Sequence, residues 1–149
     1  MIIKPYPGIP LYGNQKFRDK KCPRETVEQC TFVNAIRSQY PDSYGLILIH
    51  PENEKKLING QFSAVSKSRA MGLSPGASDI IIPGNPSFCM ELKRADRTLS
   101  DLSIEQLAYL YAAKEAGSFV CIALGHAAAM EAFNDWLKIK EKYKNIYNF

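Results

Sequence analysis

Two carboxylates and a lysine lie close together in the stretch SDIIIPGNPSFCMELK. Short apolar runs at residues 79–82 and 87–92 flank the turn PGNPS, and this pattern predicts a β-hairpin. Asp79 begins the first strand, and Glu91 and Lys93 end the second. Because side chains alternate across a strand, Glu91 and Lys93 share one face, and the hairpin brings Asp79 beside Glu91.

Such a cluster could bind a metal and hydrolyse phosphodiester bonds. Carboxylates at short range repel each other, and a divalent cation that takes oxygens from both relieves the repulsion. Mg²⁺ or Mn²⁺ is the expected cation for such ligands. Lys93 could then orient an attacking water or stabilise charge on a phosphate. A strand end with these residues is also typical of a solvated rim with a weak salt bridge, so the spacing alone leaves both interpretations open.

The composition is that of a packed globular domain. The chain has 149 residues, of which 46% are hydrophobic and 23% charged, and these values exclude disordered and fibrous classes. Its four cysteines lack the C-x-x-C spacing, which argues against a zinc site or a disulfide framework. No apolar run has the length of a signal or membrane segment, so we expect a cytoplasmic protein that binds no membrane. The net charge of +4 suits a polyanionic partner.

Helices and strands are predicted to alternate around the hairpin. The helices are predicted over residues 25–40, 61–72, 103–117 and 126–143, and the strands over residues 45–50, 79–82, 87–92 and 118–124. This order predicts an α/β fold with a small mixed β-sheet flanked by helices. We expect one domain over residues 25–149, preceded by a basic N-terminal arm over residues 1–24. The arm carries six cations against the single acid Asp19: Lys4, Lys16, Arg18, Lys20, Lys21 and Arg24.

Four motifs follow one another along the chain at fitting intervals. The helix motif ETVEQ comes first and precedes GLILIHPENE. The second motif, GLSPGASD, ends at Asp79, and the third, ELK, spans residues 91–93. The fourth, SIEQ, opens a later helix that leads into EAGSFVCIAL. In this order they resemble the VRR-NUC nucleases of the PD-(D/E)XK superfamily, particularly the short stand-alone phage type. The resemblance runs from Glu25 to about Trp136. The chain departs from the family where Ser78 replaces a proline before the aspartate, a change that should leave the metal ligand in place.

The resemblance implies a restriction-endonuclease-like PD-(D/E)XK core and a metal-dependent DNA endonuclease. The implied catalytic residues are Glu25, Asp79, Glu91, Lys93 and Gln106. The implied ligands of Mg²⁺ or Mn²⁺ are the carboxylates of Asp79 and Glu91 and the backbone carbonyl of Leu92, with Lys93 as the catalytic lysine. Short phage members of the family resemble Holliday-junction resolvases that act as dimers. A branched-DNA substrate, a homodimer and, for a phage protein, the host cytoplasm are therefore implied.

Two of the implied residues have competing roles. Gln106 lies three residues after Ser103 and could close a capping box, yet it shares a helical stripe with Leu110, which favours a position at the site. Glu25 occupies the polar end of a buried helical face, and Glu28 competes with it for the site. Either acid could instead complement the helix dipole.

Basic residues near the hairpin could contact the DNA backbone, although a solvated face would have the same composition. These candidates are Lys55, Lys56, Lys67 and Arg69. Polar loop or cap roles are expected for His50 and His126, since neither has a partner at ligand spacing. The alternative function is a nuclease-like DNA-binding or assembly module without catalysis, which the complete set of Asp79, Glu91 and Lys93 disfavours.

Overall fold

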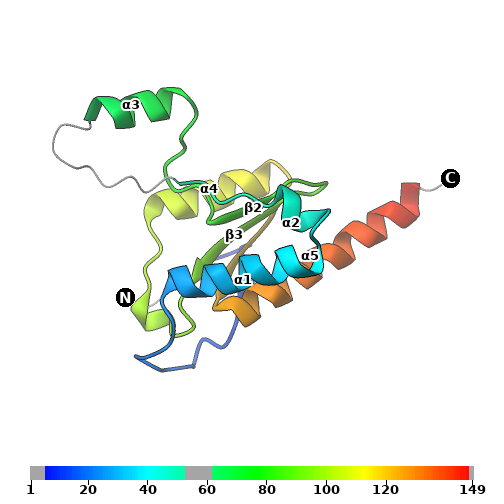
Figure 1. Cartoon of the computed structure of the whole chain (residues 1–149), viewed down its shortest axis with the longest axis horizontal. Helices are drawn as coiled ribbons and strands as arrows, with labels where there is room; N and C mark the ends of the chain where they lie inside the picture. The colour runs from blue at the N-terminus through cyan, green and yellow to red at the C-terminus, as the bar shows by residue number, and fades with distance from the viewer. Residues whose placement is uncertain (1–5, 53–61, 148–149) are drawn as a thin grey trace.

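A four-stranded mixed β-sheet forms the centre of the computed structural model, which describes residues 6–52 and 62–147 (Figure 1). Its strands are β1 (Leu11–Tyr12), β2 (Ile80–Ile82), β3 (Phe88–Lys93) and β4 (Phe119–Leu124). They lie in the order β1-β4-β3-β2, where β4 is parallel to both of its neighbours and β2 is antiparallel to β3. The predicted hairpin and the predicted α/β fold class are confirmed.

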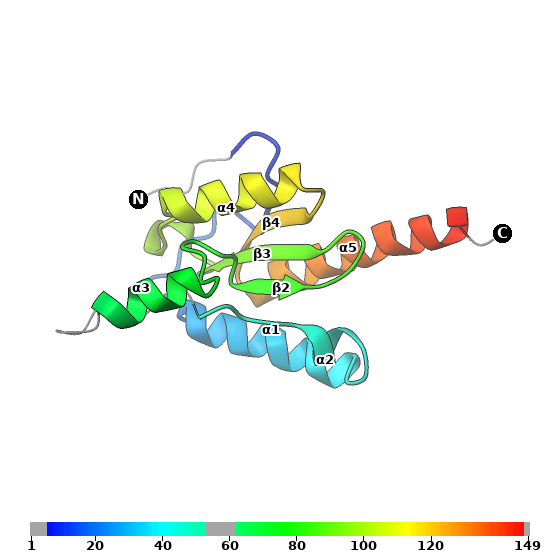
Figure 2. The same ribbon diagram turned by 90° about the horizontal axis from the view of Figure 1, so that it is seen from above.

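Helices cover both faces of this sheet. The helices are α1 (Glu25–Gln39), α2 (Tyr44–Ile47), α3 (Phe62–Ala70), α4 (Ile104–Glu115) and α5 (His126–Tyr147), with a short 3₁₀ helix η1 (Arg97–Leu99). Figure 2 shows α4 on one side of β3 and β4 and α1 on the other, where α5 also packs. Helix α3 lies to one side of this body in both views. None of the described helices is long and apolar enough to cross a membrane.

The alternation of side chains along β3 decides where the charged residues point. Phe88 and Met90 are fully buried in the larger core against α1 and α5, beside Trp136. Cys89 packs on the opposite face, in the smaller core that Leu110 of α4 completes. Because Glu91 and Lys93 follow Cys89 at intervals of two, they point to the α4 side of the sheet.

The strand predicted over residues 45–50 is wrong. Residues Tyr44–Ile47 form the helical turn α2, and only Ile49 makes a bridge to the sheet, opposite Ile81. Gly45 allows this turn to pack on α1, because a Cβ there would lie 2.7 Å from the Cα of Arg37. Leu46 is left 72% exposed, so the apolar run is not buried along its length.

The N-terminal segment contributes more to the fold than its irregular sequence indicates. Leu11 and Tyr12 form β1, which pairs in parallel with Ile122 and Ala123 at the edge of the sheet. The remaining predicted helices and strands are confirmed with shifts of a few residues at their ends.

Candidate active site

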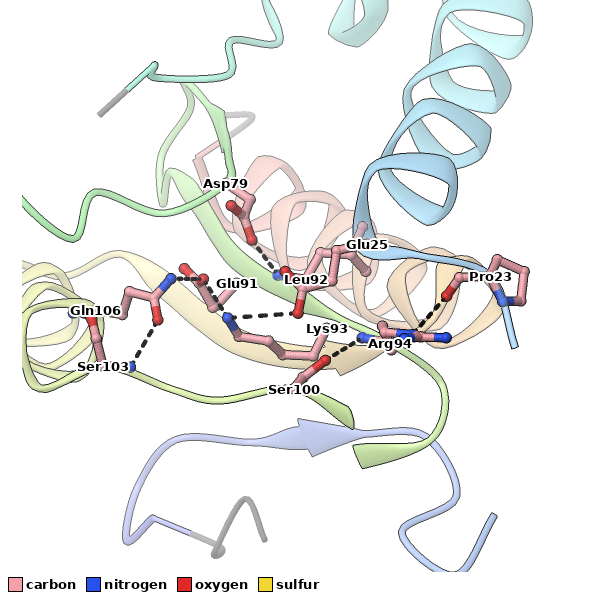
Figure 3. A network of polar contacts seen from close by, with 10 residues as sticks. All are labelled: Pro23, Glu25, Asp79, Glu91, Leu92, Lys93, Arg94, Ser100, Ser103 and Gln106. Atoms are coloured by element: carbon pink, nitrogen blue, oxygen red, sulfur yellow. Dashed lines mark hydrogen bonds and ion pairs between the residues drawn. The ribbon is translucent and has the colours of Figure 1, made fainter. Parts of the chain in front are cut away.

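The β2–β3 hairpin brings Asp79 to the end of β3. Asp79 immediately precedes β2, and Ile80 is the register partner of Met90. The Asp79 Oδ2 atom accepts a hydrogen bond of 2.8 Å from the backbone N–H of Leu92 (Figure 3). This contact fixes the Asp79 carboxylate against the peptide that joins Glu91 to Leu92 in β3.

The carboxylates of Asp79 and Glu91 share a largely dehydrated environment. Glu91 is fully buried, and burial followed by the charge of Asp79 raises its pKa well above the ordinary value, although Lys93 opposes the shift. Burial also raises the pKa of Asp79, despite the Leu92 hydrogen bond and the charge of Lys93. The two acids therefore resist holding two negative charges without a further cation.

Lys93 lies beside Glu91 of its own strand and Glu25 at the start of α1, and it also feels the charge of Asp79. Its Nζ atom is 3.2 Å from Glu91 Oε1 and 4.0 Å from Glu25 Oε1, and its side chain is buried (Figure 3). Burial lowers the pKa of Lys93, but the charges of Glu91, Glu25 and Asp79 outweigh it and leave the pKa raised. The ammonium is thus protonated and held in place.

Gln106 has both of the roles that the sequence left open. Its backbone N–H donates to Ser103 Oγ and its side-chain oxygen accepts from the Ser103 N–H at 2.9 Å, which completes a capping box at the start of α4. The Nε2 group of the same side chain donates a hydrogen bond to Glu91 Oε1. The cap therefore fixes the amide in the orientation that reaches the buried carboxylate.

The first turn of α1 separates the roles of Glu25 and Glu28. Glu25 faces Lys93, whereas Glu28 is buried elsewhere and its Oε2 accepts from the backbone N–H of His126 at 2.6 Å. The His126 Nδ1 atom lies 2.7 Å from the same oxygen. Glu25 is consequently the acid of α1 that belongs to the cluster, and Glu28 joins α1 to the start of α5.

One oxygen in the cluster is suited to a metal ion. Glu91 Oε2 is buried and accepts no hydrogen bond from an N–H group of the described residues, while Oε1 is shared by Gln106 and Lys93. Within the described ranges no group of three or more His, Cys, Asp or Glu side chains could hold a metal. Two carboxylates still fit Mg²⁺ or Mn²⁺, because Mg²⁺ usually binds one or two protein carboxylates and keeps several waters. The backbone of Leu92 lies next to the Asp79 carboxylate, because its N–H donates a hydrogen bond to Asp79 Oδ2.

The predicted backbone-binding lysines and arginine are not brought to this cluster by any described contact. Lys67 and Arg69 are exposed on α3, which lies to one side of the sheet. Lys55 and Lys56 lie outside the described residues.

The structure adds two neighbours that the sequence did not reveal. His50 Nδ1 lies 2.6 Å from the backbone oxygen of Asp79, a contact that depends on the bridge between Ile49 and Ile81 and so leaves no local signal. Arg94 donates to the carbonyls of Cys22 and Pro23, just before α1 begins. In the sequence, only the position of Arg94 directly after Lys93 indicated that it could lie near the site.

Ser78, which directly precedes Asp79, is fully buried beside the site. Its Oγ atom has no hydrogen-bond partner in the described part of the chain.

Comparisons with known proteins support the fold. No protein-family model matches the sequence, and no curated protein matches it. A solved structure described as a VRR_NUC domain protein is similar over 79% of this chain and 91% of its own, with a TM-score of 0.62 and 18% sequence identity. The chain therefore has a VRR_NUC-like fold.

Proposed function

We propose that this protein is a metal-dependent DNA endonuclease, with Mg²⁺ or Mn²⁺ as its cofactor. The observation that carries the proposal is the buried convergence of Asp79, Glu91 and Lys93, in which burial and the charge of Asp79 raise the pKa of Glu91 well above its usual value. Two buried carboxyl groups at short range disfavour each other's charged form, and a divalent cation that binds both relieves this repulsion. The similarity in fold to a VRR_NUC domain protein supports the nuclease class.

In this proposal the carboxylates of Asp79 and Glu91 hold the cation, with the Leu92 carbonyl as a third oxygen. A bound Mg²⁺ or Mn²⁺ supplies Lewis-acid polarisation of a phosphate oxygen and a more acidic water. Lys93, kept protonated by its acidic neighbours, donates to the attacking water or to the phosphate as negative charge develops.

Glu25 and Gln106 act by positioning the two groups that they contact. Gln106 fixes one oxygen of Glu91 through its amide and leaves the other oxygen for the cation. Glu25, 4.0 Å from Lys93 Nζ, restrains the ammonium at the end of β3. The active site thereby combines residues from α1, the hairpin and α4.

A branched-DNA substrate and a homodimer extend the proposal. They rest on the resemblance of the sequence motifs to short phage VRR-NUC nucleases. A cytoplasmic location, in the host if the protein is phage-encoded, belongs to the same extension.

The experiment incubates the purified protein with a four-way junction, a flap, a single strand and a linear duplex, each with Mg²⁺, Mn²⁺ or EDTA. We expect cleavage of at least one substrate that depends on the metal. Equal cleavage in EDTA would contradict the role of the carboxylates. Binding of DNA under every condition without any cleavage would instead identify a binding or assembly module that has retained a nuclease fold.

A further inference from the structure

The segment before α1 presents a row of exposed cations that ends at the candidate active site. Within residues 14–24 the side chains of Lys16, Lys20, Lys21 and Arg24 are exposed. None of these four lies within ion-pair distance of a carboxylate in the part of the chain that the structure describes.

This row belongs to a fixed surface, because the backbone of the segment is bound to the body of the protein. The N–H of Asp19 donates to Asp96 Oδ2 at 2.9 Å, and Cys22 is buried. Arg94 donates to the carbonyls of Cys22 and Pro23. The backbone that carries the lysines is therefore anchored to the loop that follows β3.

The nearby acids are already engaged by backbone and side-chain donors. Asp96 also accepts from the N–H and the hydroxyl of Thr98, and these bonds lower its pKa. Asp19 Oδ1 accepts from the N–H of Lys21. Arg18 donates to the carbonyls of Gln15 and Phe17, so we assign it a role in shaping the segment.

The end of the row meets the active site through the chain itself. Arg24 directly precedes Glu25, whose carboxylate lies 4.0 Å from Lys93 Nζ. On the other side, Arg94 follows Lys93 and holds the carbonyls before Arg24. A polyanion that lay along these cations would therefore reach the residues proposed to cut it.

An exposed aromatic ring interrupts the cations. Phe17 is 39% exposed and lies at an open hollow that it lines with Asn14, Ala95, Leu124 and Glu131, among other residues. The lining of the hollow is largely apolar and includes the acid Glu131, which repels phosphate. The uncharged ring of a nucleic-acid base therefore suits the hollow better than a phosphate group does. Aromatic side chains among cations bind unpaired bases by stacking.

We propose that Lys16, Lys20, Lys21 and Arg24 seat the phosphates of one substrate strand and lead it to Lys93, with Phe17 stacking on a base where the strand is unpaired. The inference rests on the proposed nuclease function for the identity of the polyanion. It places the principal strand contacts on the N-terminal segment, whereas the sequence alone pointed to residues between 55 and 69.

The test measures binding in EDTA, by fluorescence anisotropy, of a labelled single strand and of its duplex over a range of salt concentrations. The triple variant Lys16→Gln, Lys20→Gln, Lys21→Gln is compared with Lys138→Gln, Lys142→Gln, Lys144→Gln, which removes the same charge from exposed positions on α5. Figures 1 and 2 show that end of α5 projecting away from the N-terminal segment.

The N-terminal triple should weaken binding about tenfold or more at about 0.1 M salt and reduce the salt slope by about 2 for a single strand. The α5 triple should change binding less than about threefold. Equal losses in the two triples would overturn the inference, because the effect would then come from net charge alone.

Phe17→Leu keeps an apolar side chain but removes the ring. It should weaken binding of the single strand about fivefold or more and leave the duplex nearly unchanged. Equal affinities of Phe17→Leu and the unaltered protein for the single strand would overturn the stacking contact.

Cleavage separates this inference from the proposed function. With Mg²⁺ the N-terminal triple should raise KM and leave kcat at saturating DNA nearly unchanged. If the unaltered protein cuts DNA and the N-terminal triple variant cuts it with the same KM, the inference is contradicted and the proposed function is not. The unaltered protein is also mixed with phosphatidylserine vesicles. Binding to the vesicles with no binding to any oligonucleotide would contradict both the inference and the proposed nuclease function.

Discussion

The side-chain amide of Gln106 donates to Glu91 Oε1, the same oxygen that lies 3.2 Å from Lys93 Nζ. One carboxylate oxygen is thus held by two donors from different elements, while Oε2 has none among the described residues. The buried acid is oriented before any cation binds. The capping box of α4 contributes directly to this orientation.

The capping and orienting roles of Gln106 can be separated by mutation. Ser103→Ala removes the hydroxyl that caps α4 and should cost about 1 kcal/mol of stability. Gln106→Ala keeps the backbone N–H that bonds Ser103 Oγ but removes the side-chain half of the capping box and the donor to Glu91, so it should lose no more stability than Ser103→Ala and, in addition, about tenfold or more in cleavage rate. Thermal unfolding and single-turnover cleavage of both variants provide the comparison. Similar rates for Ser103→Ala and Gln106→Ala would show that the amide serves only the cap.

The raised pKa of Glu91 predicts an unusual pH dependence of stability without metal. A carboxyl whose pKa is higher in the folded than in the unfolded state binds more protons when folded. Its stabilising effect is present below the unfolded pKa and is lost as the pH rises toward the folded pKa. Glu91→Gln, which mimics the neutral form, should therefore gain stability relative to wild type as the pH increases from about 5 to 8 in EDTA.

Thermal unfolding of both proteins across this pH range measures the difference, in which titrating groups away from the cluster cancel and the change reports Glu91 together with its neighbours Asp79 and Lys93. Added Mg²⁺ or Mn²⁺ should raise the melting temperature of the wild type and have little effect on Glu91→Gln, because a ligand stabilises the state that binds it. A difference that is constant with pH would contradict the burial of an ionised Glu91.

Arg94 is expected to act through Glu25. It holds the two carbonyls that precede α1, and the first residue of α1 is the acid beside Lys93. Arg94→Ala and Glu25→Gln should each reduce cleavage about tenfold, and the double variant should be little worse than either, since coupled residues are not additive. Arg37→Ala, an exposed charge in the last turn of α1, is the matched control and should be neutral. Additive losses from Arg94→Ala and Glu25→Gln would mean that the two residues act independently.

The proposed junction substrate requires a symmetric assembly. Paired incisions on opposing strands need two active sites related by a two-fold axis. We therefore expect light scattering to give the mass of a dimer and junctions to be nicked symmetrically. A monomer that leaves junctions uncut but cleaves linear DNA would remove the resolvase-like specificity and leave the nuclease function intact.

Much of the hairpin and its flanking helices could be predicted from local sequence. The turn PGNPS and the alternating pattern around it placed Asp79, Glu91 and Lys93 together, and the structure brings them together. The interval from Ser103 to Gln106 allowed a capping box as one of two roles for Gln106, and the structure has the box together with the contact to Glu91. These features depend on residues near one another along the chain.

Features that depend on distant packing could not be predicted. The apolar run at residues 45–50 has no period that separates a strand from a helical turn, and its contact with α1 decides the outcome. Strand β1 is two residues long and is defined by its pairing with β4. Glu25 and Glu28 both lie in the first turn of α1, so only the positions of Lys93 and His126 could distinguish their roles.

Single-turnover cleavage by the wild type, Asp79→Asn and Lys93→Ala tests the central claim most directly. Asp79→Asn should lose activity at limiting Mg²⁺ and regain part of it with excess Mn²⁺, since the change weakens a metal ligand. Lys93→Ala should lose about a hundredfold or more and should not be rescued by either metal. Circular dichroism and DNA binding should be unaltered in both. If either folded variant cleaves at the wild-type rate with limiting Mg²⁺, the charged residues between positions 79 and 93 are not the catalytic centre.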